Sequence, residues 1–260
     1  MKIGAYQFAV TGDMERNFQK IKWAIAQAAQ NSVRVLVFPE CALTGYPPRD
    51  IASSSEVDFE KVTLCCDELA LLAAQHDMHV IVGAITKEQN KHYNTAIVFT
   101  ANSERVVYNK RALWGWDRDN FCPGDQNGVS EIDGLKIGIR ICFEVRFPEY
   151  FRELYRENTD LNIILFYDVS DWDDVGRYDL IKGHIRTRAV ENVCHTLSVD
   201  TVSPYQTAPT GLYDMSGGIV CELERNQEGL LVYDFLAAEM DFGERGRKEI
   251  SDMLTERGKI

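Results

Sequence analysis

The chain lacks any long hydrophobic run. No apolar stretch approaches the roughly 18 residues that a membrane-spanning helix needs. The first residues, MKIGAYQFAVTGD, turn polar after about ten positions and lack the apolar core of a signal peptide. We therefore expect no membrane-spanning segment and a cytoplasmic location.

Basic residues are scarce relative to acidic ones. The 28 Lys and Arg residues against 40 Asp and Glu residues give a formal net charge of −12 at pH 7. A protein of this charge is repelled by nucleic-acid phosphates and by anionic membrane surfaces. No local run of Lys and Arg offsets the excess, so neither nucleic acid nor a membrane is an expected partner.

The chain also lacks the cysteine spacings of a disulfide scaffold or a zinc site. Its 7 cysteines are odd in number and include no CxxC pair. The HxxH spacing of His76 and His79 has no carboxylate pattern that would complete a metal site. We therefore expect reduced thiols, no metal and no cofactor.

What the chain does have is a globular composition and a series of short β-branched runs. Hydrophobic residues make up 45% of its 260 residues and charged residues 26%, which suits a single large core. Several runs, such as VLVF and IILF, are apolar throughout, as is typical of strands buried on both faces. The predicted strands span 2–9, 33–38, 79–86, 94–100, 105–109, 135–141, 161–166, 193–200, 218–223 and 229–235.

Helical spacing of apolar residues fills some of the gaps between these strands. Asp13 is a predicted N-cap, and Phe18, Ile21 and Ile25 then follow helix spacing. Further helices are predicted over 57–76, 148–157, 179–192 and 244–257. Strand–helix–strand units mix with strand pairs, which favours an α/β fold with mixed sheets. No repeat or linker divides the chain, so we expect one domain over 1–260.

Three chemically capable residues each follow a predicted strand. Glu40 follows VRVLVF and a proline, Lys110 follows RVVYN, and Cys142 follows LKIGIRI. Taken singly, each suits a plainer role: a solvated loop carboxylate, a surface lysine and a small buried hydrophobe. Cys142 differs in its flanks, because the apolar strand stops there and a helix is predicted from Pro148. A thiol at such a turn lies near helix N–H dipoles that favour a thiolate.

Together these residues form a constellation for acyl chemistry. A sulfur nucleophile needs a base to take its proton, and the oxyanion that follows needs a positive donor. A glutamate can take that proton and return it to a leaving amine. A lysine can stabilise the oxyanion and keep the glutamate ionised. The hypothesis is a Cys142 nucleophile served by Glu40 and Lys110.

The windows around these residues resemble the nitrilase, or carbon–nitrogen hydrolase, superfamily. The resemblance rests on FPE with TGY downstream, on NK at a strand end, and on GxxIC followed by RFPE. FCPG followed by Asp125 and the RTRAVEN segment at 186–192 extend it, and similarity runs from Lys2 to about Phe235. The resemblance implies a four-layer α-β-β-α sandwich with two mixed sheets.

The resemblance also implies roles for the catalytic residues. Glu40 becomes the general base and acid, Lys110 the oxyanion donor and Cys142 the nucleophile. Many members have a second glutamate four residues before the phenylalanine of F-x-P-G. Asp117 occupies that position here as a supporting carboxylate, with Asp119 as its competitor.

Further residues are expected to contact a substrate. The backbone N–H of Phe143 resembles the family's second oxyanion donor, and the segment 169–172, with Ser170 and Trp172, resembles its substrate-contacting strand end. Tyr46, in the loop beyond Glu40, either anchors that loop or lines the pocket.

The implied activity is hydrolysis of a non-peptide carbon–nitrogen bond in a small amide or N-carbamoyl compound, through a cysteine acyl-enzyme. Acyl transfer to another acceptor and nitrile hydrolysis use the same machinery and stay open. A non-catalytic scaffold is disfavoured, because the three key residues are intact. The sequence does not name the substrate.

The resemblance further implies a homodimer or higher homo-oligomer. The helices predicted over 148–157 and 179–192 are the expected contact elements. Tyr150, Phe151 and Leu154 are expected to supply apolar area that a monomer would leave exposed.

Overall fold

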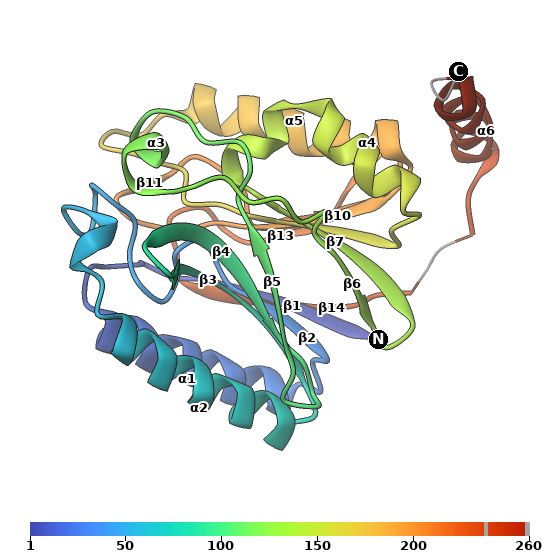
Figure 1. Ribbon diagram of the computed structural model, residues 1–260. Coiled ribbons are helices and arrows are strands. Elements are labelled where there is room, and N and C mark those ends of the chain that lie inside the picture. Colours follow the sequence, from blue (N-terminus) through green and yellow to red (C-terminus); the bar gives the residue numbers. More distant parts are fainter. Residues whose placement is uncertain (237–238, 258–260) are drawn as a thin grey trace.

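The computed structural model describes residues 1–236 and 239–257 (Figure 1). Residues 237–238 and 258–260 of the expected 1–260 domain lie outside the described part. No helix within the described ranges is both long and apolar enough to cross a bilayer.

Two six-stranded mixed sheets form the centre of the molecule. The strand order of the first sheet is β14 (Gly229–Asp234), β1 (Lys2–Gln7), β2 (Val35–Val37), β3 (His79–Glu88), β4 (Lys91–Phe99) and β5 (Arg105–Asn109). The order of the second is β13 (Ile219–Glu222), β12 (Gly211–Tyr213), β10 (His195–Val199), β8 (Leu161–Leu165), β7 (Leu135–Ile141) and β6 (Val129–Ile132). A small antiparallel pair joins β9 (Val169–Ser170) to β11 (Tyr205–Gln206).

Helices cover the outer face of each sheet (Figure 1). The first sheet carries α1 (Met14–Gln30) and α2 (Phe59–Gln75), and the second carries α4 (Pro148–Arg156) and α5 (Val175–Asn192). Three short helices, η1 (Ser54–Glu56), α3 (Trp116–Asn120) and η2 (Cys142–Arg146), lie in connections. The terminal helix α6 (Phe242–Arg257) lies beyond the sandwich (Figure 1). The predicted four-layer α-β-β-α sandwich with two mixed sheets is confirmed.

The apolar core has three layers, and strand alternation assigns residues to them. Val35 and Val37 of β2 face the core between the sheets, whereas Leu36 faces the helices. In β8, Ile163 faces the inner core and Ile164 faces α4 and α5. Because both faces of these central strands are covered, their sequences are apolar throughout, as the continuous runs indicate.

The predicted elements are all present, with shifted ends. Asp13 caps α1 by accepting the N–H of Arg16. The hairpin of β3 and β4 extends to Glu88 and Lys91, beyond the apolar runs, because backbone pairing continues over polar residues. The unpredicted elements are short: β6, β9, β11, β12, α3, η1 and η2 span two to five residues each, too few for a periodic pattern.

One expectation about exposed apolar area was wrong. Phe151 and Leu154 of α4 are fully buried against the second sheet and α5, so they offer nothing to a partner. Their helix presents Tyr150 instead, which is half-buried.

Candidate active site

The topology brings several strand ends to one edge. The strands β1, β2 and β3 run parallel, and β5 has the same direction because it is antiparallel to β4, which is antiparallel to β3. Glu40 and Lys110 therefore follow strands that end at the same edge of the first sheet. Cys142 follows β7, one of three parallel strands of the second sheet. A 3.2 Å hydrogen bond from the N–H of Glu40 to the carbonyl of Phe166, just after β8, ties the two edges together.

Lys110 forms the centre of a buried ionic cluster. Its Nζ lies 2.8 Å from Oε1 of Glu40 and 2.8 Å from Oδ2 of Asp117. The three side chains are almost completely buried. A buried ammonium is stable only with such partners, so the cluster fixes the position of the lysine.

Glu40 is oriented by more than Lys110. The side-chain amide of Asn94 donates to its Oε1 at 2.6 Å, and the backbone N–H of Tyr167 donates to its Oε2 at 2.8 Å. The backbone carbonyl of Asn94 also accepts the N–H of Lys110. No sequence pattern marks Asn94. It lies near Lys110 and Glu40 because β4, which carries it, pairs with β5. Both carboxylate oxygens of Glu40 are therefore held in fixed directions.

Asp117, rather than Asp119, belongs to the cluster. Asp117 is buried in the short helix α3, and its Oδ1 accepts the hydroxyl of Tyr46 at 2.8 Å. Asp119 is exposed to solvent. Tyr46 stacks on the ring of Tyr167 and also lines the cavity, so it serves both of the roles considered for it.

Cys142 begins η2 immediately after β7, with a φ of +45°. Only a few per cent of non-glycine residues have positive φ, and such conformations are held by the surrounding structure. The turn directs the cysteine into a cavity of about 490 Å³ whose walls include Lys110, Asp117 and Phe143. Within the described part of the chain, no hydrogen bond joins the Cys142 thiol to Glu40 or Lys110. Cys142 and Lys110 line the same cavity, but Nζ of Lys110 is bound to the carboxylates of Glu40 and Asp117 rather than to the sulfur.

The electrostatics keep the resting sulfur protonated. Burial raises the pKa of the Cys142 thiol well above its usual value, Glu40 adds to this shift and Lys110 opposes it. The turn dipoles, which favour a thiolate, are thus opposed first by burial and then by the charge of Glu40. Burial also raises the pKa of the Glu40 carboxyl, with Lys110 opposing and Asp117 adding to the shift. Burial disfavours the Lys110 ammonium, but Glu40 and Asp117 outweigh it and hold its pKa well above the usual value.

Two expected substrate contacts are not on this cavity. Trp172 is 66% exposed and Ser170 is buried in the β9–β11 pair, where its Oγ accepts the N–H of Trp172. Neither residue lines the cavity of Cys142. From Ser170 onward the segment turns away from the cavity, whereas Val169, the first residue of β9, and the preceding Tyr167 and Asp168 form the wall.

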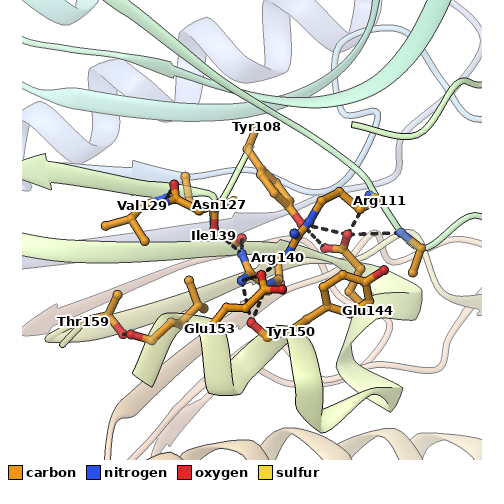
Figure 2. A network of polar contacts seen from close by, with 12 residues as sticks. Tyr108, Arg111, Asn127, Val129, Ile139, Arg140, Glu144, Tyr150, Glu153 and Thr159 are labelled. Atoms are coloured by element: carbon orange, nitrogen blue, oxygen red, sulfur yellow. Dashed lines mark hydrogen bonds and ion pairs between the residues drawn. The ribbon is translucent and has the colours of Figure 1, made fainter. Parts of the chain in front are cut away.

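Glu144 connects the segments that carry Lys110 and Cys142 (Figure 2). It is fully buried, and its two oxygens accept the hydroxyl of Tyr108 at 2.7 and 2.8 Å. They also accept the backbone N–H groups of Arg111 and Ile141, each at 2.8 Å. A buried carboxylate that receives only neutral donors must be positioned accurately to be stable.

Arg140 anchors β7, the strand before Cys142, from the other side (Figure 2). Its fully buried guanidinium donates to the backbone carbonyls of Asn127, Ile139 and Tyr150. It lies over the ring of Tyr108, which joins it to the Glu144 network. The strand that ends at Cys142 is thereby held against α4.

Comparison with known proteins identifies the family. The family model of the carbon–nitrogen hydrolases matches residues 2–241, so the chain belongs to this family. The resemblance in the sequence is thereby confirmed, and the protein is an enzyme of the class that hydrolyses non-peptide carbon–nitrogen bonds.

Its curated relatives include amidases and nitrilases. The chain is 28% identical over 203 residues to an (R)-stereoselective amidase from Pseudomonas sp., covering 78% of this chain and 71% of the relative. It is 27% identical over 197 residues to the 2-oxoglutaramate amidase of Bacillus subtilis, covering 74% of this chain and 73% of the relative.

Solved structures share the fold. The amidase of Nesterenkonia sp. AN1 has a TM-score of 0.82 at 22% identity, covering 100% of both chains. A structure of a mutant of that amidase, again with a TM-score of 0.82 and 22% identity, covers 100% of this chain and 97% of that one. It shows covalent addition of the acetamide moiety of fluoroacetamide at the active-site cysteine of that amidase.

Proposed function

We propose that the protein is an amidase that converts the carboxamide of a small molecule into its acid and ammonia through a thioester at Cys142. The observation that carries this proposal is the position of Cys142 on the same cavity as a buried lysine held between two carboxylates. This arrangement supplies a nucleophile, a base and an oxyanion donor within one site.

In the first half-reaction, Glu40 takes the proton of the Cys142 thiol as the sulfur attacks the amide carbon. The carbonyl oxygen becomes an oxyanion, which accepts hydrogen bonds from Nζ of Lys110 and from the backbone N–H of Phe143. The protonated Glu40 then gives its proton to the amide nitrogen. The carbon–nitrogen bond breaks, ammonia leaves and a thioester remains on the sulfur.

In the second half-reaction, water replaces ammonia. Glu40, ionised again, takes a proton from water while the oxygen attacks the thioester carbon. The same two donors hold the second oxyanion. The carbon–sulfur bond then breaks, the sulfur recovers the proton from Glu40, and the free acid leaves.

The raised pKa of Glu40 suits this cycle. A base works best when its pKa lies near the working pH, and burial moves the carboxyl in that direction. Because the thiol is protonated at rest, each turnover begins with the proton transfer to Glu40. Asp117 supports the cycle by holding Lys110 and by keeping it charged.

The size of the cavity supports a small substrate. At about 490 Å³ it is at the small end of ligand pockets, and Trp114 and Trp116 form part of its wall. The names of two curated relatives, both amidases, support the choice of an amide over a nitrile.

The test is ammonia release from a panel of small amides, N-carbamoyl compounds and nitriles. We expect turnover of amides by the wild-type protein and none by Cys142→Ala. Cys142→Ser should be nearly inactive, because a hydroxyl is far less acidic than a thiol. Wild-type turnover by a folded Cys142→Ala protein would disprove the nucleophile, and release only from nitriles would replace the proposed activity.

We also propose that the protein assembles as a homodimer through α4 and α5. The apolar side chains that support this choice are the exposed Phe147, Val175 and Leu180, in or beside these helices. These three side chains, rather than the buried Phe151 and Leu154 of α4, are the expected contact residues.

A further inference from the structure

The two oxygens of the Glu40 carboxylate have different surroundings. Oε1 accepts two hydrogen bonds, from Nζ of Lys110 at 2.8 Å and from Nδ2 of Asn94 at 2.6 Å. Oε2 accepts one, from the backbone N–H of Tyr167 at 2.8 Å, and within the described residues no further donor reaches it. Each carboxylate oxygen has two lone pairs that can accept a hydrogen bond. Both are therefore occupied on Oε1, and one is free on Oε2.

The two oxygens are also bonded to different sheets. Asn94 lies on β4 and Lys110 follows β5, so both donors to Oε1 come from the first sheet. Tyr167, the donor to Oε2, follows β8 of the second sheet. The parallel neighbour of β8 is β7, which ends one residue before Cys142. Oε2 is therefore the oxygen on the side of the sheet that carries the nucleophile.

The free lone pair decides which oxygen can hold a proton. With a proton on Oε2, Oε1 becomes the carbonyl oxygen and still accepts from both Lys110 and Asn94. A proton on Oε1 would instead point an O–H group at the ammonium or at the amide N–H. One of these two donors would then lose its acceptor inside the protein, which is strongly unfavourable and most of all for a charged donor.

The orientation of the Asn94 amide is tied to Glu40. Asn94 is fully buried, and its Oδ1 has no hydrogen-bond partner in the part of the chain that the structure describes. A buried acceptor without a partner destabilises a fold and needs an explanation. Turning the amide over would aim Oδ1 at Oε1 of the carboxylate, and the two oxygens would repel each other. The unpaired Oδ1 is therefore the consequence of presenting Nδ2 to Glu40.

We propose that Oε2 is the oxygen of Glu40 that carries the catalytic proton, and that Asn94 is the positioning residue that keeps Oε1 out of the exchange. Asn94 does not line the cavity, so it acts through Glu40. The proton of the Cys142 thiol passes to Oε2 as the sulfur attacks, and then to the leaving nitrogen. In the second half-reaction Oε2 takes a proton from water and returns it to the sulfur. This proposal rests on the amidase function proposed above.

The kinetic test replaces Asn94 with leucine, an apolar side chain of similar size that cannot donate. The hydrogen bond from Asn94 lowers the pKa of the Glu40 carboxyl, so its loss should raise that pKa. We expect the acid limb of kcat/KM in Asn94→Leu to move to higher pH. We also expect kcat to fall roughly 10- to 100-fold with little change in KM, because the base is no longer held in place.

Asn94→Asp extends this test. It places a negative charge beside Oε1, so the acid limb should move further in the same direction than in Asn94→Leu. Both variants retain the charged and titratable side chains that interact with the Glu40 carboxyl: Lys110, Asp117, Cys41, Cys142 and Tyr46. The shift in each variant can therefore be assigned to the change at Asn94.

Asn162→Leu is the matched control for damage to the fold. Asn162 is an equally buried asparagine near the start of β8, and its Nδ2 also lacks a partner among the described residues. Its Oδ1 accepts the hydroxyl of Thr159, far along the chain from the Glu40 contacts. This variant should keep the wild-type pH profile. An unmoved acid limb in Asn94→Leu, or an equal shift in Asn162→Leu, would overturn the positioning role. Circular dichroism checks that each variant is folded.

A direct test of the oxygen needs neither a variant nor turnover. Neutron diffraction from deuterium-exchanged crystals of the wild-type protein, at a pH where Glu40 is protonated, locates the deuteron on the carboxyl group. We expect it on the oxygen that accepts the N–H of Tyr167. A deuteron on the oxygen bonded to Lys110 and Asn94 would overturn the proposal. This measurement decides the question even where Asn94→Leu fails to fold.

The failure of this inference differs from failure of the proposed function. A deuteron on Oε1 or an unmoved acid limb would remove the role of Oε2 or of Asn94, while ammonia would still be released from an amide. Absence of ammonia release from every amide would instead contradict the amidase function.

Discussion

Glu144 accepts a 2.8 Å hydrogen bond from the backbone N–H of Arg111, so a carboxylate two residues after Cys142 holds the residue after the buried Lys110. Its other oxygen accepts the N–H of Ile141, the residue before Cys142, at the same distance. One side chain, whose contacts with Arg111 and Tyr108 are drawn in Figure 2, thus links the segment that follows Lys110 to the strand that ends before Cys142.

The first prediction is that Glu144→Gln lowers kcat by about 10- to 100-fold with little change in KM, because small errors in position are costly in rate. The reason is geometric. The two backbone N–H groups reach different oxygens, and an amide offers only one acceptor oxygen. One N–H would face the NH2 group, and its segment would shift. Steady-state kinetics on any amide substrate measures the effect.

Glu153→Gln is the matched control for this prediction. Glu153 belongs to the same network through Arg111 and Arg140, but it bonds to side chains only and is partly exposed. It should retain wild-type kcat. Equal kcat losses in the two variants would show that the network acts through its charge rather than through the backbone contacts.

The second prediction concerns the pH dependence of kcat/KM. Glu40 must be ionised to act as a base, and burial raises the pKa of its carboxyl, so the acid limb should lie above the usual glutamate range. The charge of Asp117 adds to that shift, so Asp117→Asn should move the acid limb to lower pH. The variant should lose less activity than Glu40→Gln, which can neither take nor return a proton.

Asp119→Asn is the control for this shift. It removes the same charge two residues away, at an exposed position outside the cluster. Its pH profile should match the wild type. A profile of Asp117→Asn that moves to higher pH, or does not move, would contradict the electrostatic role of Asp117.

The third prediction is that Lys110→Ala loses at least about 10²-fold in kcat, the usual effect of removing one oxyanion donor. It also leaves Glu40 and Asp117 buried without their cation. The pKa of Glu40, already raised by burial, should rise further without the opposing charge of Lys110, so its protonated form supports the fold. Stability of the variant relative to wild type should be retained at low pH and fall as the pH rises through that pKa. Thermal unfolding at about pH 5 and pH 8 tests the sign, and a variant that loses more stability at the lower pH would contradict it.

The sequence could predict the fold and the strand-end residues because both depend on local patterns. Continuous apolar runs indicate strands buried on both faces, and Glu40, Lys110 and Cys142 each stand where such a run stops. The family resemblance then supplied the arrangement of these strands in two stacked sheets, which periodicity does not encode; the pairing of strands within each sheet came from the structure. The structure places Asp117 beside Lys110 and leaves Asp119 in solvent, a choice that spacing left open.

What the sequence could not predict depends on contacts between distant segments. Asn94 lies on β4 and its side chain bonds to Glu40, which follows β2, although β3 separates these two strands in the sheet. Trp172 and Ser170 turn away from the cavity because β9 pairs with β11, two-residue strands without a sequence pattern. The protonation state of Cys142 depends on burial and on Glu40, which sequence neighbours do not reveal.

The fourth prediction is a dimeric mass by light scattering at micromolar concentration. Leu180 on α5 is 53% exposed, so Leu180→Glu should shift the mass toward the monomer by placing a charge in the contact. Leu71→Glu is the control, because Leu71 is 67% exposed on α2, on the opposite face of the sandwich. A monomeric wild-type mass would contradict the dimer, and dissociation by the α2 variant alone would move the contact to the other face.

The fifth prediction concerns Gly83, which lies on β3 under the loop that carries Glu40. A Cβ at this position would lie 2.6 Å from Cα of Glu40, against backbone that is bonded to the second sheet and cannot give way cheaply. Gly83→Ala should therefore cost about 1–3 kcal/mol of stability and displace the base, with a fall in kcat. Gly246→Ala is the matched control, because a Cβ there meets nothing within 4 Å and the site lies inside α6, away from the proposed dimer contact. That variant should retain activity and gain up to about 1 kcal/mol of stability from helix propensity.

Chemical denaturation measures the stability of both variants, and steady-state kinetics measures their kcat. A Gly83→Ala protein with wild-type stability and turnover would show that the Glu40 loop is not held by this close approach.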